Sequence, residues 1–209
     1  METDRNWIVV RIDGKIAAIS KDYRLLAEIS ARISAPEKSG RSIRKSGQER
    51  ILYQKISAET VGFDDVWKLR QESSWEDFLL FGTEFQKKVW RKLWELTHAT
   101  GPRSKTSTHL VSYSDFAGLC QNRAGVRAVA HAIGLNPISV VIPCHLVIPK
   151  ESIDKMRAIN SKAEATIFKG DDLCLSSILK NETIDFGNYS MGSELKRRLI
   201  TLELTGESL

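Results

Sequence analysis

Cys144 lies in the run ISVVIPCH, directly before His145, and is the side chain in this sequence best placed to do chemistry. A cysteine attacks carbon as its thiolate, and an ordinary thiol is mostly protonated at neutral pH. It therefore needs a base, and the base needs a group that holds it in place. Taken alone, an adjacent Cys-His pair more often marks a small buried cysteine beside a core histidine than a catalytic pair.

The other cysteines and histidines form no pattern that holds a metal ion or a disulfide framework. Cys120 and Cys174 are far from Cys144 in the sequence, no Cys-x-x-Cys pair is present, and the four histidines are scattered. We therefore expect no metal site of the usual spacing and a reducing compartment, which is the cytoplasm, or the nucleus in a eukaryote. No apolar run has the length that spans a bilayer, and the first residues lack a secretory pattern, so we expect no membrane association.

Positive charge is concentrated in the middle of the sequence. Residues 81–146 contain 8 basic and 3 acidic side chains, and this excess equals the net charge of +5 of the whole chain. A locally basic region is typical of proteins that bind polyanions. It is equally typical of a solvated helix face, because four of the basic residues share one amphipathic stretch at 87–92.

The first eighty residues predict a small sheet with a helix. Residues 7–20 read as two short strands around an Asp-Gly turn, which is a strong hairpin signal. Helical spacing follows over 21–33, then a loop rich in Ser, Gly, Lys and Arg over 34–48 and a third strand at about 50–57. This part of the sequence contains no pattern with recognisable chemistry.

The middle of the sequence predicts a helix over 83–97, a polar loop over 98–109 and then two short helices. Ser112 and Asp115 resemble a capping box that opens the first short helix, and the segment QNRAG predicts a turn. The second short helix covers VRAVAHAIG and ends at Asn136-Pro137. Helix, turn and helix in this order form a helix-turn-helix, although many helix pairs are connected in this way.

The final third of the sequence contains the nucleophile and one clear helix. The apolar run ISVVIPCH predicts a buried strand or extended segment that presents Cys144 at its end. Residues 150–183 contain two candidate short helices, and 193–204 have the pattern of an amphipathic helix. Strands and helices together place the chain in the α/β (α+β) class.

Five short motifs occur in an order that is highly specific as a set. They are GTEFQKKVW at 82–90, SY at 112–113, RAVAHAIGLNP at 127–137, IPCH at 142–145 and GNYS at 187–190. With these motifs the sequence resembles the O6-alkylguanine-DNA alkyltransferases, also called methylated-DNA–protein-cysteine methyltransferases. The resemblance covers residues 82–146 and 187–203, which is under half of the chain.

The resemblance implies a two-domain organisation. Residues 1–80 would form a small sheet-and-helix domain that is ribonuclease H-like. Residues 81–209 would form a mainly helical winged helix-turn-helix domain that carries both the DNA-binding surface and the active site. Residues 147–186 would be an insertion within this second domain. Because every motif lies outside the insertion, we expect it to be dispensable for the chemistry.

The resemblance also implies direct-reversal DNA repair. A methyl or other alkyl group would move irreversibly from O6-alkylguanine, with O4-alkylthymine as a further candidate substrate, to Cys144. His145 would take the thiol proton through a water, Glu203 would orient His145, and Asn136 would be a hinge between the recognition helix and the active-site strand. An S-alkylcysteine is a thioether with no electrophile that water can attack. Each chain would therefore act once, as a single-turnover methylated-DNA–[protein]-cysteine S-methyltransferase without a cofactor.

The implied partner is double-stranded DNA that contains O6-alkylguanine, bound through its minor groove by a monomer. The target nucleotide must leave the base stack, and Arg127 would fill the gap. Ala128, Ala130 and Gly134 would leave the second helix thin enough to approach the groove. The residues that would line the base pocket are Tyr113, Tyr189, Ser190 and Met191. Outside the resemblance, these positions have ordinary interpretations as a helix-start arginine, small helix residues, packed aromatics and a polar turn.

The sequence departs from the family pattern at two single positions besides the insertion. Leu146 follows His145 where the family usually has arginine, so a structural ion pair is expected to be lost. Met191 follows Ser190 where the family commonly has glycine, so less space is expected in the base pocket.

Three other function classes compete with the alkyltransferase. A non-enzymatic alkyltransferase-like sensor would bind damaged DNA but lack the reactive cysteine, and Cys144 argues against it. A helix-turn-helix regulator would carry more base-reading side chains than Arg127 and His131 on its second helix. A cysteine hydrolase would need an oxyanion site, for which the sequence contains no signal.

Overall fold

A computed structural model describes residues 6–21, 27, 55–98, 110–165, 181 and 183–205. The chain divides into two compact units: residues 1–83 with 137–141, and residues 84–136 with 142–209. The predicted loops at 34–48 and 98–109, and nearly all of the helix predicted over 21–33, lie outside the described residues. The described structure is a mixed helix-and-strand fold, with a small sheet in the first unit and mainly helices in the second.

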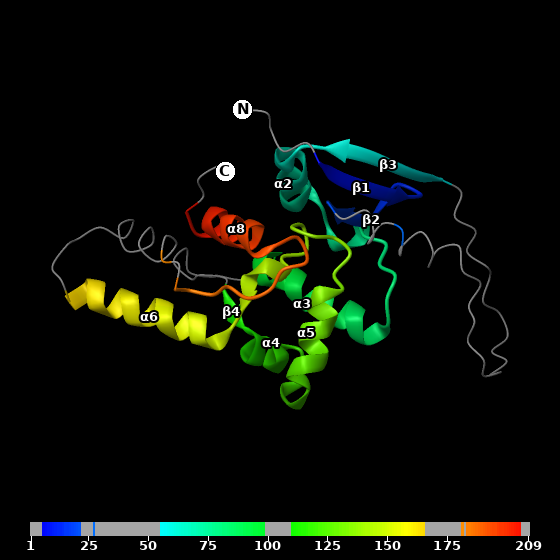
Figure 1. The fold of residues 1–209 in the computed structure, drawn as a ribbon. Helices are drawn as coiled ribbons and strands as arrows, with labels where there is room; N and C mark the ends of the chain where they lie inside the picture. Colours follow the sequence, from blue (N-terminus) through cyan, green and yellow to red (C-terminus); the bar gives the residue numbers. More distant parts are fainter. Residues whose placement is uncertain are drawn as a thin grey trace. The chain divides into compact units, whose positions relative to one another are not determined.

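The first unit contains a three-stranded antiparallel sheet in the order β2-β1-β3 (Figure 1). The predicted hairpin is confirmed: β1 (Trp7–Ile12) and β2 (Lys15–Ser20) are joined at Asp13 and Gly14, which both have positive φ. The third strand, β3 (Ile56–Val61), begins later than predicted. Its residues are mostly exposed, so the apolar alternation that marks a half-buried strand is missing from the sequence there.

A helix that the sequence analysis missed follows the sheet. Helix α2 (Phe63–Glu72) begins after Gly62, whose N–H donates to Asp65 Oδ2 at 3.1 Å, and a short 3-10 turn, η1 (Trp75–Asp77), comes next. Within α2 only Val66 and Arg70 are buried. Phe63, Val66 and Trp67 have helical spacing, so the signal was present in the sequence but short.

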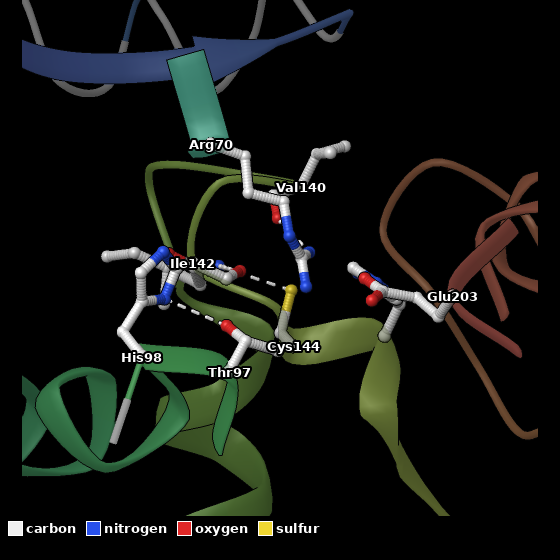
Figure 2. A network of polar contacts seen from close by, with 9 residues as sticks. Arg70, Thr97, His98, Val140, Ile142, Cys144 and Glu203 are labelled. Carbon is white, nitrogen blue, oxygen red and sulfur yellow. Dashed lines mark hydrogen bonds and ion pairs between the residues drawn. The ribbon is translucent and has the colours of Figure 1, made fainter. Parts of the chain in front are cut away.

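The segment 137–141 belongs to the first unit and was predicted as part of a buried strand or extended segment. It is buried, and Ile138 makes an isolated bridge to Ile19, but it forms no strand. The chain forms turns, with Val140 at a φ of 69°, a left-handed conformation that is rare for a β-branched residue. Arg70, itself buried, donates from Nη1 to the Val140 carbonyl at 2.8 Å (Figure 2). The backbone of Ile19 bonds the same segment on both sides, through Pro137 O at 2.9 Å and Ser139 N at 3.1 Å. These tertiary contacts override the β propensity of the apolar run.

The second unit is built mainly from helices (Figure 1). Its described elements are α3 (Glu84–His98), β4 (Val111–Ser112), α4 (Tyr113–Leu119), η2 (Arg123–Gly125), α5 (Val126–Gly134), η3 (Cys144–Leu146), β5 (Val147–Ile148), α6 (Lys150–Ala165) and α8 (Ser193–Thr205). Strands β4 and β5 pair in parallel, which joins the start of α4 to the chain just after Cys144. No helix in these described ranges is apolar and long enough to cross a bilayer.

The predicted helix, turn and helix are confirmed as α4, η2 and α5, which pack against each other. Ser112 caps α4 by accepting from the N–H of Asp115 at 3.0 Å, and Gln121 makes the turn with a φ of 58°. Trp90 of α3 donates from Nε1 to the Ala132 carbonyl of α5 at 2.8 Å and fastens the second helix to the body of the unit. The ribonuclease H-like and winged details of the predicted fold stay predictions.

The first of the two helices predicted over 150–183 is confirmed as α6, which spans Lys150–Ala165. The second would lie in residues 166–180, which are outside the described part of the chain. Met156 of α6 is buried in an apolar cluster with residues of β5, α8 and the segment before α8. The members of this cluster are Ile148, Met156, Ile184, Phe186 and Ile200. The insertion therefore contributes to the core of the second unit.

Candidate active site

Cys144 is the first residue of η3 and is 7% exposed. The Asn136 side chain donates from Nδ2 to Cys144 Sγ at 3.2 Å and to the Ile142 carbonyl at 2.8 Å (Figure 2 draws the bond to the sulfur as a dashed line). An amide nitrogen has two hydrogens, so both donors of Asn136 have an acceptor. This side chain fixes the backbone just before the cysteine and the cysteine sulfur at the same time.

His145 and Glu203 form the second polar contact of the site. His145 Nε2 lies 2.9 Å from Glu203 Oε1, and the imidazole is fully buried. The two residues come from η3 and α8, so the final helix delivers the carboxylate to the histidine. The Glu203 carboxylate fixes the orientation of the imidazole ring and favours a proton on Nε2. The other ring nitrogen, Nδ1, is then the one that can accept a proton.

Burial raises the pKa of the Cys144 thiol in the resting structure. Four interactions oppose this effect, in decreasing order: the hydrogen bond from Asn136, the positive charge of Lys196, the hydrogen bond from Tyr189 and a hydrogen bond from the backbone of Cys144. Burial has the largest effect, so the thiol is protonated at neutral pH and requires a base to become a nucleophile.

Lys196 is a site residue that the sequence analysis missed. It is 1% exposed, and its Nζ donates to the Val147 carbonyl at 2.9 Å and to the Asn188 carbonyl at 3.5 Å. Burial lowers its pKa to about 8, although the charges of Cys144 and Asp185 act in the opposite direction. One signal was present in the sequence: within α8, Lys196 has helical spacing to the buried Ile200 and to Glu203.

The residues expected to line a base pocket are partly gathered around Cys144. Tyr113 is half-buried, and burial together with the charges of Cys144 and Asp185 raises the pKa of its hydroxyl. The Tyr189 ring meets the His145 ring edge-to-face, with centroids 6.5 Å apart. Ser190 is exposed and Met191 is half-buried in the turn between this tyrosine and α8.

Helix α5 presents a face with little side-chain bulk. Arg127, Ala128, His131 and Gly134 are exposed, and Ala130 is half-buried. A Cβ added to Gly134 would meet no atom within 4 Å, so the glycine is not required by packing inside this chain. The exposed positions 128, 131 and 134 are about one turn apart, and with Arg127 at the N-terminal end they define a narrow surface.

Leu146 occupies the position where the resemblance places an arginine. Its side chain is fully buried, so an apolar residue fits the site without an ion pair.

Among the described residues of both units, His, Cys, Asp and Glu side chains form no group of three or more that could hold a metal ion.

Comparison with known proteins identifies the region around the site. Residues 84–166 match the family model for the 6-O-methylguanine DNA methyltransferase, DNA binding domain. A probable methylated-DNA–protein-cysteine methyltransferase of Acanthamoeba polyphaga mimivirus is 43% identical over 76 residues, which are 36% of this chain and 45% of that protein. The methylated-DNA–protein-cysteine methyltransferase of Saccharomyces cerevisiae strain S288c is 35% identical over 103 residues, which are 49% of this chain and 44% of the relative. The chain thus spans less than half the length of these curated relatives.

Solved structures with the same description are also similar. O6-methylguanine-DNA methyltransferase from Pyrococcus kodakaraensis strain KOD1 is 24% identical with a TM-score of 0.46, over 94% of this chain and 90% of the other. Mycobacterium tuberculosis OGT in complex with DNA is 22% identical with a TM-score of 0.42, over 68% and 65%. By the family model and the curated relatives, residues 84–166 of this chain are similar to the DNA-binding domain of 6-O-methylguanine DNA methyltransferases.

Proposed function

We propose that this protein repairs DNA by moving an alkyl group from the O6 atom of guanine onto Cys144. The observation that carries the proposal is the arrangement of this thiol, which has an amide donor from Asn136 on its sulfur and is directly followed by the His145–Glu203 pair. A nucleophile, a base and a group that orients the base are the three parts that such a transfer needs. The curated relatives are named for the transfer of a methyl group from methylated DNA to a protein cysteine.

The first step is removal of the thiol proton. Because the Cys144 thiol is protonated at rest, His145 takes its proton through a water, at the ring nitrogen opposite the one that faces Glu203. The carboxylate of Glu203 stabilises the imidazolium that forms. Lys196 and Asn136 stabilise the new thiolate, by charge and by hydrogen bonding respectively.

The second step is displacement at the alkyl carbon. The thiolate sulfur forms a bond to carbon as the bond from carbon to guanine O6 breaks, and the electron pair of that bond stays with the guanine. The guanine anion then takes up one proton, which balances the proton that Cys144 gave to His145, and it remains in the DNA as normal guanine. Tyr113 keeps its hydroxyl proton at neutral pH because its pKa is raised, so it can donate a hydrogen bond to the departing base.

The product explains why one chain acts once. S-alkylcysteine is a thioether, and neither water nor a neighbouring group of the site has an electrophilic carbon to attack in it. Regeneration of the thiol would require a second acceptor for the alkyl group. The proposed activity is therefore stoichiometric.

The narrow surface of α5 fits the minor groove of double-stranded DNA. Small and exposed residues allow the helix backbone to approach the groove, where the base edges carry little sequence information. A repair protein benefits from this, because lesions occur in any sequence. Arg127, at the exposed start of the helix, fills the space that the flipped nucleotide leaves.

Tyr189, Ser190 and Met191 form the side of the proposed base pocket. A Met191 side chain, half-buried in the turn before α8, reduces the space for bulky alkyl groups. Apolar pockets discriminate by about 1–3 kcal/mol per methylene, so methyl is the preferred group and benzyl is disfavoured.

A duplex with one O6-methylguanine tests the proposal against the damage-sensor alternative. The protein should remove the methyl group from DNA, and Cys144→Ala should bind the same duplex without removing it. Binding by the unaltered protein with no loss of methyl from the DNA would reject the transferase and favour the sensor.

A further inference from the structure

The segment that leads into α8 is held by α6 from one side and by α8 from the other (Figure 1). On the α6 side, the buried Ser152 hydroxyl donates to the Asp185 carbonyl, and Lys155 Nζ donates to the Thr183 carbonyl at 3.0 Å. On the α8 side, Arg197 Nη2 donates to the Ile184 carbonyl at 2.7 Å. Three successive carbonyls of this segment are therefore fixed by side chains from the two helices.

The Asp185 carboxylate is also held in place. Its Oδ1 accepts from the N–H of Gly187 at 2.8 Å, and Gly187 has a φ of +81°. A Cβ on Gly187 would lie 3.1 Å from Pro149 Cδ and 3.8 Å from Lys196 Nζ. The backbone of Gly187, two residues after Asp185, thus lies beside the ammonium group of Lys196. Only glycine combines the backbone conformation and the small volume that this position requires.

The Lys196 ammonium group donates to two backbone carbonyls and is affected by two negative charges. The carbonyls of Val147 and Asn188 accept its hydrogens, and the Tyr113 ring lies 5.9 Å from its nitrogen. The charges that act on it are those of Cys144 and Asp185, and both raise its pKa against the effect of burial. Lys196 in turn favours the thiolate of Cys144. Asp185 and the ionised Cys144 are therefore two negative charges that both favour the charged form of Lys196.

We infer that α6 is a positioning element for the nucleophile: Ser152 holds Asp185 where its carboxylate keeps Lys196 charged, and Lys196 stabilises the thiolate of Cys144. This inference deepens the proposed function and rests on it for its biological meaning. It assigns a role to the inserted stretch, which carries none of the recognised motifs. It also reverses the expectation that the insertion is dispensable for the chemistry.

The test is the rate at which iodoacetamide alkylates Cys144 in the full chain near neutral pH, followed by peptide mapping. Asp185→Asn preserves the side-chain size and an acceptor for the Gly187 N–H but removes the charge. It should slow alkylation about three- to tenfold, as expected when part of one pKa unit of thiolate stabilisation is lost. Ser152→Ala removes the hydrogen bond to the Asp185 carbonyl and should also slow the alkylation of Cys144. Asp154→Asn is the matched control, because Asp154 is an exposed acid on the same helix, paired with Arg157 at 3.8 Å, and should leave the rate unchanged.

A double-mutant cycle separates electrostatic positioning from general damage. In a Lys196→Met background, Asp185→Asn should have no further effect on the alkylation rate, because the charge that it supports is gone. An unchanged rate in Asp185→Asn alone, or an equal loss with and without Lys196, would overturn the inference. Iodoacetamide requires neither DNA nor alkylguanine, so these outcomes leave the proposed function standing. Conversely, a protein that shows the expected cycle but transfers no methyl group from DNA would reject the function alone.

Discussion

His145 Nε2 and Glu203 Oε1 lie 2.9 Å apart, although 58 positions separate the two residues in the sequence. The histidine is adjacent to the nucleophile, and the carboxylate is on the final helix of the described chain. If Glu203 supports His145 as a base, the negative charge of its carboxylate must stabilise the protonated imidazole, in addition to the hydrogen bond between them.

Glu203→Gln tests that requirement, because glutamine can still bond to the imidazole but does not stabilise the imidazolium. We expect the rate of methyl transfer from duplex DNA to fall about tenfold or more, since a general base contributes at least this much. Single-turnover kinetics with a labelled methyl group measure the rate. Glu194→Gln, at an exposed acid in the first turn of the same helix, is the control and should react normally. A Glu203→Gln protein as fast as the control would show that the carboxylate has no part in proton transfer.

Asn136→Ala removes both donors that end on Cys144 Sγ and the Ile142 carbonyl. The buried carbonyl loses its partner, so the free energy of unfolding should fall by about 1–3 kcal/mol. The pKa of the Cys144 thiol should rise, because the largest interaction that lowers it is lost. Thermal unfolding and the pH dependence of Cys144 alkylation measure the two effects. Loss of stability with an unchanged pH profile would assign Asn136 a purely structural role.

Much of the site could be predicted from the sequence, and the reason is local. Cys144 and His145 are neighbours in one motif, and Asn136 belongs to the motif that directly precedes it in the chain. The predicted hairpin and the α4–α5 pair are also local patterns, in which turn residues and apolar spacing agree with the structure.

The missed features depend on tertiary contacts. In the segment SELKRRL, Lys196 is buried and Arg198 is exposed. Only the helical spacing of Lys196 to the buried Ile200 distinguishes the two cations in the sequence. The turns at 137–141 are stabilised by bonds to Arg70 and to the backbone of Ile19, which are distant in sequence. Strand β3 has no apolar face, so its position could not be inferred from hydrophobic alternation.

Arg127→Ala should slow repair of duplex DNA much more than reaction with a free O6-alkylguanine base, because only the duplex leaves a gap when the nucleotide flips. Arg123→Ala, which removes another exposed cation at the turn before α5, is the matched control. It should mainly weaken DNA binding and reduce the salt slope by about one unit. Equal losses on duplex and on free base would contradict a gap-filling role for Arg127.

The buried Lys196 predicts a dependence of stability on pH. Its pKa is about 8 in the folded protein and has an ordinary value of 10.5, so between these values the unfolded chain binds more protons. The free energy of unfolding should therefore rise with pH across this window, relative to Lys196→Met, by on the order of 1 kcal/mol per pH unit. Below about pH 8 the difference between the two proteins should not change with pH. Urea unfolding of both proteins from neutral to alkaline pH measures it, and parallel curves would show that the amine is not buried in solution.

The central claim is that Cys144 accepts one alkyl group, once. Intact-mass measurement after incubation with excess O6-methylguanine duplex tests it directly, with peptide mapping to locate the modification. We predict a mass increase of a single methyl group in place of one hydrogen, located at Cys144, and methyl removal from DNA that stops at one equivalent per chain. Modification of Cys120 or Cys174 instead, or removal of many methyl groups by each chain, would contradict the mechanism.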